Sequence, residues 1–178
     1  MNKIIGIIIG TVAILTLGAC TKSKLELTYN TQEGRIDSYI SSKGEDYRFV
    51  RNGGANRLIL KEGEGEELQK NGFVSFYYAG YTFSGSVSSS NLFVTNHQAT
   101  AEQAGWNLTD ADYQLYEINI GDTKLIPGLR DGLLGVKAGE ECEILFSGKY
   151  GFGNEEFGII PANSALLYKI WVVGVAND

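Results

Sequence analysis

Few side chains in this sequence could carry acid–base, nucleophilic or metal chemistry. The one histidine, His97, lies in a stretch without regular periodicity, and we interpret it as a solvated loop residue. A zinc site needs several His, Cys or carboxylate ligands at short spacing, and the sequence has no such cluster. It has no Gly-x-Ser-x-Gly nucleophile elbow either. The residue types therefore favour neither hydrolysis nor metal chemistry, and they imply no cofactor.

Apolar side chains are concentrated instead in a glycine-rich segment near the C-terminus. Residues 148–153 read Gly-Lys-Tyr-Gly-Phe-Gly, and residues 158–161 read Gly-Ile-Ile-Pro. Glycine and proline at this density indicate a loop. A loop with large apolar side chains places them on a rim and not in the core. The segment therefore predicts an apolar rim at this end of the molecule.

A short helix and a strand must hold this loop in place. Pro127 is pre-set for the first turn of a helix, and the residues around it repeat at helical spacing. The apolar residues near one face of this helix are Ile126, Leu129, Leu133 and Leu134. Residues 141–146 alternate, which predicts a strand with one nearly all-apolar face.

The strongest strand pattern spans residues 73–83, and Gly80 within it predicts a bulge or a close backbone approach. Residues 47–50 and 57–60 predict two strands around a turn. Residues 30–42 predict a helix that Asn30 caps, with Glu33 completing a capping box. We expect this helix to pack on the domain, with a dimerisation arm as the alternative. Because strands dominate, we expect an α+β fold: an antiparallel sheet wrapped around a short helix.

The first 20 residues have the pattern of an export signal. Lys3 precedes an uncharged apolar or small run over residues 4–17, which is shorter than the roughly 20 residues of a membrane span. The run ends in Leu17-Gly18-Ala19-Cys20, which resembles the bacterial lipoprotein cleavage box. The resemblance implies a signal peptide over residues 1–19, a lipid on the sulfur of Cys20, and a domain held outside the cytoplasm in the bacterial envelope. A plain secretory peptide and a short membrane anchor are the alternatives.

Charge and cysteine content limit the partners and the crosslinks. The chain of 178 residues has 15 basic and 21 acidic side chains and a net charge of −6. This balance argues against nucleic acid, because a phosphate backbone needs a basic stripe. If Cys20 carries lipid, Cys142 has no partner for an intrachain disulfide and is expected to be a core residue.

The order of motifs over residues 71–175 resembles the FKBP-type peptidyl-prolyl cis-trans isomerase family. That pattern is a strand, Gly, two aliphatic residues, Gly, a short helix, Gly, a strand, Tyr-x-aromatic-Gly, Ile-Pro and a last strand. The resemblance implies an FKBP-like domain at residues 63–178 with an insertion at 84–112. Before it lie a tether at residues 20–27 and a helix-and-hairpin extension at 28–62. It also implies proline-containing polypeptides as partners, and we expect a monomer.

Carried over residue by residue, the resemblance implies a pocket with aromatic and aliphatic walls. The backbone N–H of one residue, Ile126, is implied to hold a ligand carbonyl. For Tyr116 and Tyr168, ordinary core packing remains the alternative. The implied pocket residues are Tyr78, Phe93, Tyr116, Leu125, Ile126, Leu129, Phe152, Ile160 and Tyr168.

Three positions depart from the family pattern. The pocket floor is usually Trp and is Leu129 here, Val94 stands where Asp usually follows the phenylalanine, and the loop tyrosine is Phe152. The resemblance therefore implies weak or substrate-selective prolyl isomerase activity, assisting the folding of exported proteins. A non-catalytic FKBP-like module that binds peptides or proteins is the alternative. A further hypothesis is that Trp106 folds over the pocket and replaces the missing floor.

Overall fold

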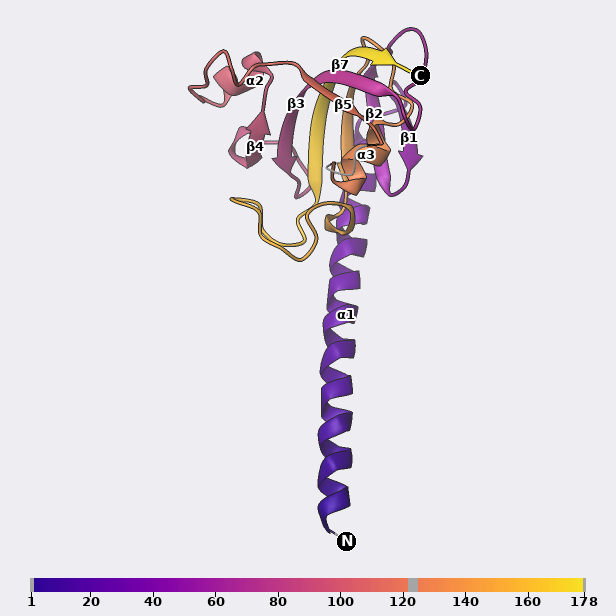
Figure 1. Cartoon of the computed structure of the whole chain (residues 1–178), viewed down its shortest axis with the longest axis vertical. Coiled ribbons are helices and arrows are strands. Elements are labelled where there is room, and N and C mark those ends of the chain that lie inside the picture. Colours follow the sequence, from indigo (N-terminus) through magenta and orange to yellow (C-terminus); the bar gives the residue numbers. More distant parts are fainter. Residues whose placement is uncertain (1, 122–124, 178) are drawn as a thin grey trace.

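The computed structural model describes residues 2–121 and 125–177, with side chains described from Lys22 onward. The first element is one long helix, α1 (Asn2–Ser42), which extends away from the folded domain (Figure 1). The expected helix at 30–42 is therefore only the end of α1. The predicted cap at Asn30 is wrong, and residues 20–27, expected as a tether, are helical. No glycine or proline between residues 20 and 29 interrupts the helix.

Within the part of the chain whose side chains are described, no helix has the length and apolar character needed to cross a membrane.

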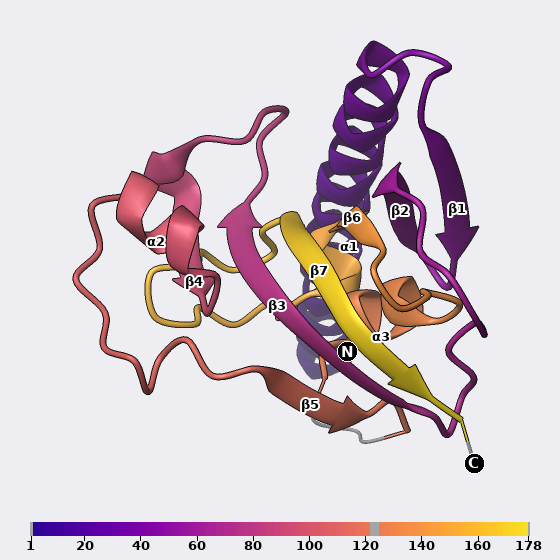
Figure 2. The same cartoon turned by 90° about the horizontal axis from the view of Figure 1, so that it is seen from above.

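The strands form one antiparallel sheet in the order β1-β2-β6-β7-β3-β4, and β5 pairs with β3 beside β4. β5 pairs with the first half of β3 and β4 with its second half, so the two share one edge. Figure 2 shows α2 and β4 beside β3 at this edge and the β1–β2 hairpin at the other. The strands are β1 (Arg48–Asn52), β2 (Ala55–Lys61), β3 (Phe73–Thr82), β4 (Leu92–Thr95), β5 (Tyr116–Asn119), β6 (Glu141–Phe146) and β7 (Leu166–Ala176). The shorter helices are α2 (Gln98–Gln103), α3 (Pro127–Leu133) and the 3-10 turns η1 (Ser89–Asn91) and η2 (Gly148–Tyr150).

Helices cover both faces of the sheet, and alternation along the strands divides the core in two. On one face, Leu129 and Leu133 of α3 pack with Ile144 of β6. On the other face, Ile36 of α1 packs with Leu145 of β6. The expected antiparallel α+β fold, with a sheet around a short helix, is confirmed. The expectation that the helix at 30–42 packs on the domain is confirmed as well, because this end of α1 buries the second face of the sheet.

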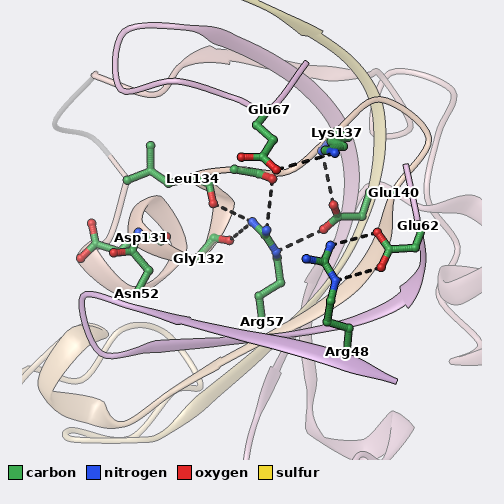
Figure 3. Close-up of polar contacts among 11 residues, drawn as sticks. Arg48, Asn52, Arg57, Glu62, Glu67, Asp131, Gly132, Leu134, Lys137 and Glu140 are labelled. Carbon is green, nitrogen blue, oxygen red and sulfur yellow. Dashed lines mark hydrogen bonds and ion pairs between the residues drawn. The ribbon is translucent and has the colours of Figure 1, made fainter. Parts of the chain in front are cut away.

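A buried arginine fixes the C-terminal end of α3 (Figure 3). Arg57 of β2 is 4% exposed, and its guanidinium donates to the carbonyl oxygens of Gly132, Leu134 and Gly135 at 3.1, 2.7 and 3.1 Å. The last carbonyls of a helix lack partners within it, and a cation at this end is favourable. Arg57 Nε also lies 3.2 Å from Oε1 of Glu140, which is 1% exposed. This cluster sets the position of α3 against β2, and with it the position of Leu129.

The sequence expectation for Gly80 is confirmed, because the pairing of β3 with β4 shifts register between Gly80 and Tyr81. The hypothesis for Trp106 is wrong. Its ring is half-buried against the cluster of Ile36, Tyr81 and Phe83 on the α1 face of the sheet. The segment at 84–112, which holds η1, β4 and α2, therefore packs on both clusters, with Phe93 and Val94 on the α3 face and Leu92 and Trp106 on the α1 face.

Candidate functional site

A cavity of about 510 Å³ opens between β3, β4, β5, the start of α3 and the loop at 147–165 that joins β6 to β7. The strands, the start of α3 and the loop all turn aromatic or aliphatic side chains into the cavity. No described lining residue carries a charge, so the cavity is apolar. The lining residues are Phe76, Tyr78, Phe93, Val94, Tyr116, Leu125, Leu129, Phe152, Phe157, Gly158, Ile159, Ile160 and Tyr168.

Eight of the nine predicted pocket residues line this one cavity. The exception is Ile126, whose side chain packs on the core while its neighbour Leu125 lines the cavity. Ile126 is the residue before the first turn of α3, and among the described residues its N–H has no acceptor. The catalytic roles of all nine residues remain predictions.

Edge-to-face contacts hold the rings of the cavity wall in fixed relation. Phe76, Tyr78 and Tyr116 form a triangle with ring centroids 5.5 to 6.0 Å apart. Phe93 of β4 stands at 86° to Tyr168 of β7, with centroids 5.8 Å apart. Rings at these separations and angles attract each other through their quadrupoles, beyond the area they bury. The cavity therefore has walls of defined shape before any ligand arrives.

The loop supplies the wall farthest from the sheet. Phe152 and Phe157 stack with centroids 4.8 Å apart and an interplanar angle of 6°. Phe157 and Ile160 exchange two backbone hydrogen bonds of 3.0 Å, which closes the tip of the loop into a tight hairpin. At that tip the side chain of Ile159 is 76% exposed. The tip therefore presents an apolar side chain to solvent at the cavity margin.

Five of the lining residues were not predicted from the sequence. Phe76 lies two residues before Tyr78 along β3, and residues two apart on a strand share a face. Its place in the cavity wall could therefore have been predicted. Phe157 and Ile159 belong to the loop whose apolar character indicated a rim, but nothing in the sequence showed which of its residues turn inward. The lining residues outside the predicted set are Phe76, Val94, Phe157, Gly158 and Ile159, and of these only Val94 had been named, as a departure from the family pattern.

The polar groups of the cavity are phenols. Burial raises the pKa of Tyr168, with a smaller contribution from the nearby Tyr78. Burial likewise raises the pKa of Tyr78, with a contribution from Tyr116. Both phenols therefore stay protonated at neutral pH and keep an O–H to donate.

His97 lies outside this cavity and is not a solvated loop residue, so that interpretation is wrong. Its ring is half-buried and stacks on Trp171 of β7, with centroids 3.8 Å apart and an angle of 9°. Its Nδ1 lies 2.9 Å from Thr100 Oγ1. Tyr77 and Trp171 alternate with the cavity residues along their strands, so His97 packs on the opposite face of the sheet. The imidazole anchors α2 there.

Cys20, the predicted site of lipid attachment, lies among residues whose side chains are outside the described part of the structure, and so does all of the predicted signal peptide at residues 1–19.

Known proteins resemble this chain in sequence and in fold. FK506-binding protein 1 of Aspergillus oryzae is 25% identical over 117 residues, which cover 66% of this chain and 94% of the fungal protein. The FKBP-type peptidyl-prolyl cis-trans isomerase FkpA of Buchnera aphidicola is 25% identical over 158 residues, 87% of this chain and 57% of that protein. Human FKBP9 is 33% identical over 94 residues, but the match covers only 16% of its length.

Solved structures show the same fold at lower identity. FkpA from Escherichia coli superposes with a TM-score of 0.57 and 17% identity, over 95% of this chain and 71% of that chain. The three FKBP domains of wheat FKBP73 give a TM-score of 0.59 and 21% identity, over 74% and 52% of the respective chains. The model of the family described as FKBP-type peptidyl-prolyl cis-trans isomerase matches residues 64–173, more than half of the chain. This chain therefore belongs to the FKBP-type peptidyl-prolyl cis-trans isomerase family.

Proposed function

We propose that this protein catalyses cis–trans isomerisation of X-Pro bonds in polypeptides, and that the ring-lined cavity holds the proline. The observation that carries the proposal is the cavity itself. Thirteen described residues surround about 510 Å³, and seven of them are aromatic residues from four strands and the β6–β7 loop. Pockets that bind organic groups have this composition: apolar and aromatic walls with few polar groups.

Such a cavity suits a reaction that needs no nucleophile. Resonance in the peptide bond sets a rotation barrier of about 18–20 kcal/mol. When the bond twists, its charge separation is lost, so water stabilises the planar amide more than the twisted one. Apolar walls that exclude water remove this preference. An acceleration of about ten-thousand-fold requires only about 5.4 kcal/mol, which desolvation, shape and one or two hydrogen bonds can supply.

The hydrogen bonds have identified donors. The N–H of Ile126, at the start of α3, is one. The protonated hydroxyls of Tyr78 and Tyr168, which line the cavity, are two more. A donor aimed at the substrate carbonyl holds the peptide while the amide turns. These phenols also provide polar contacts that Val94 and Phe152 do not.

The test is a prolyl isomerisation assay with the full chain in detergent micelles and a panel of short X-Pro peptides. We expect faster exchange than in buffer for at least part of the panel. Tyr78→Ala and Phe152→Ala should each lower kcat/KM by about tenfold or more while the unfolding transition remains cooperative. Trp106→Phe, outside the cavity, is the matched aromatic control and should leave kcat/KM unchanged. Exchange no faster than in buffer across the whole panel would refute catalysis.

A second candidate is a binding module without catalysis, and the residues at two lining positions favour it. Val94 and Leu129 give the cavity aliphatic surface where the family pattern has an acid and an indole. The same peptides distinguish the two functions. Peptide binding by titration calorimetry that is lost in Tyr78→Ala, with no acceleration of exchange, would assign the cavity to binding alone.

We further propose that the domain acts in the bacterial envelope, anchored by lipid on Cys20, on exported proteins whose X-Pro bonds exchange in tens of seconds. The sequence around Cys20 supports this assignment. Incorporation of a radiolabelled fatty acid into the protein in bacterial cells, lost in Cys20→Ser, is the expected result. Equal labelling of Cys20→Ser would exclude this anchor.

A further inference from the structure

The buried stripe of α1 contains two polar side chains beside the cavity loop. Ile36 and Ile40 on this stripe are 0% and 6% exposed and pack on the sheet. Tyr29 and Gln32, seven and four residues before Ile36, continue the same helix face and are half-buried. Figure 1 shows the β6–β7 loop passing alongside α1 at this level. Two polar residues on an otherwise packed stripe need partners, and the loop provides them.

Gln32 bridges the two ends of the loop. Its Oε1 accepts a hydrogen bond from the backbone N–H of Gly148, at 2.9 Å. Its Nε2 donates to the backbone oxygen of Asn163, at 2.7 Å. Tyr29 adds a third bond, because its hydroxyl donates to Asn163 Oδ1 at 2.6 Å. One helix thus holds the loop where it leaves β6 and where it returns to β7.

Asn163 also hydrogen-bonds to the outgoing part of the loop, at Gly153 and Asn154. Its backbone has φ of 58°, a left-handed conformation that Asn tolerates better than most residues. In this conformation its N–H donates to the Gly153 oxygen at 2.6 Å. Its Nδ2 donates to Asn154 Oδ1 at 3.0 Å. The outgoing and returning parts of the loop are therefore tied together at the residue that α1 holds.

We infer that Tyr29 and Gln32 are positioning residues for the cavity, through which α1 sets the loop that carries Phe152, Phe157 and Ile160. The catalytic consequence of this inference rests on the proposed isomerase function. Both positioning residues lie outside the family-matched segment, which begins at residue 64. The N-terminal helix therefore completes the proposed active site without lining the cavity.

The kinetic effect depends on the fraction of molecules in which the loop is attached to α1, which we call the closed arrangement. A ligand that binds only the closed arrangement has an apparent dissociation constant equal to the intrinsic one divided by the closed fraction. Loss of the attachment lowers this fraction. KM should then rise several-fold, whereas kcat, measured on molecules with substrate bound and the loop in place, should stay within about twofold. A generally damaged enzyme would lose kcat as well.

The test uses the full chain in detergent micelles and three variants. Gln32→Met keeps the length and helix propensity of the side chain but removes both of its hydrogen bonds, and Tyr29→Phe removes only the hydroxyl. Thr31→Ala, on the exposed side of the same turn, is the control. Hydrogen exchange followed by mass spectrometry should show amides at 153–160 exchanging about tenfold faster in Gln32→Met, less so in Tyr29→Phe, and unchanged in Thr31→Ala. Amides of β6 and β7 should remain protected in all three.

The outcomes separate this inference from the proposed function. Unchanged loop exchange in both Tyr29→Phe and Gln32→Met overturns the inference, even if the wild-type protein is an active isomerase. Loss of protection throughout β6 and β7 also overturns it, because α1 would then support the whole fold and not the loop. Faster loop exchange with raised KM supports it in full. Faster loop exchange in a protein without isomerase activity supports the positioning of the loop and refutes the proposed function.

Discussion

Gly80 offers a way to move the cavity wall without altering any residue that lines it. A Cβ at this position would lie 2.8 and 2.9 Å from Cζ and Cε2 of Phe93, and 2.9 Å from Cε1 of Tyr168. The φ of Gly80 is not positive, so alanine fits the backbone of β3 and the perturbation is purely steric. Gly80→Ala therefore inserts one methyl group between two rings of the wall.

The size of the effect follows from the overlap. Carbon atoms in contact are about 3.5–4.0 Å apart, so each ring must withdraw by about 1 Å. Tyr168 lies between β3 and β6 and stacks on Phe146, whereas Phe93 belongs to a strand of four residues at the sheet edge. Phe93 should therefore move further than Tyr168. Overpacking costs about 1–3 kcal/mol, partly offset by the roughly 0.5–1 kcal/mol gained when alanine replaces glycine in a strand.

We expect Gly80→Ala to lower the free energy of unfolding by about 1–2 kcal/mol. It should also lower kcat/KM toward X-Pro peptides by about tenfold or more, because a displacement of about 1 Å can cost about a hundredfold in rate. Urea unfolding and the isomerisation assay measure the two quantities. Gly174→Ala is the matched control in the neighbouring strand β7. Its Cβ would meet only Ser75 Oγ, at 3.0 Å, and this small side chain can rotate away.

Two results would refute the reasoning at different points. Wild-type stability in Gly80→Ala would mean that Phe93 and Tyr168 do not pack on β3 as described. Reduced stability with unchanged kcat/KM would mean that the rings pack there but that isomerisation takes place elsewhere. Equal losses in Gly80→Ala and Gly174→Ala would assign the effect to the strands and not to the cavity.

Three further predictions concern the groups that support the site. Arg57→Met should lower the free energy of unfolding by about 3–5 kcal/mol, measured in urea, because Glu140 loses its ion-pair partner while buried; a loss below about 1 kcal/mol would contradict the buried pair. Tyr39→Phe should cost about 1–3 kcal/mol by the same measurement, because the Tyr39 hydroxyl donates to Oε2 of the buried Glu143 at 2.8 Å; Ser38→Ala, on the exposed side of α1, is its control. Burial lowers the pKa of His97, so its imidazole resonances in the NMR spectrum should titrate below about 6.5. Because the unfolded chain then binds the proton more readily, the free energy of unfolding should fall as pH drops below about 6.5. His97→Phe, which keeps a stacked ring, should reduce this pH dependence. A titration midpoint of the imidazole above about 6.5 would reverse the direction of the pH dependence.

Much of the site could be predicted because local pattern determines it. Pro127 at a helix start, the alternation of residues 141–146 and the glycine-rich loop each occupy a short stretch of chain. Their order matched one family pattern, which placed Tyr78, Phe152 and Tyr168 around a single cavity. The close approach at Gly80 was predictable for the same reason, since a glycine inside a strong strand pattern usually marks a bulge or a crowded backbone.

The parts that were missed depend on contacts between distant residues. Glu143 alternates like a solvent-facing residue, but α1 covers it and Tyr39, 104 residues earlier in the chain, satisfies it. Gln32 has the pattern of an ordinary polar helix residue, and only Gly148 and Asn163, 116 and 131 residues later, give it a role. No periodicity within a window of about 11–18 residues contains either pairing. The environment of His97 was missed likewise, because Trp171 arrives from the last strand.

The position of β2 in the sheet has a consequence for when the chain can fold during its synthesis. β2 lies between β1 and β6, and its Ile59 pairs with Cys142. A polypeptide that emerges from a ribosome or a translocation channel N-terminus first therefore displays the β1–β2 hairpin long before its partner strand exists. Closing a loop of about 80 residues is entropically costly, and such distant pairing slows folding. A protein proposed to hasten the folding of others would thus itself fold late, with its β1–β2 hairpin exposed to chaperones and proteases until β6 is available to pair with it.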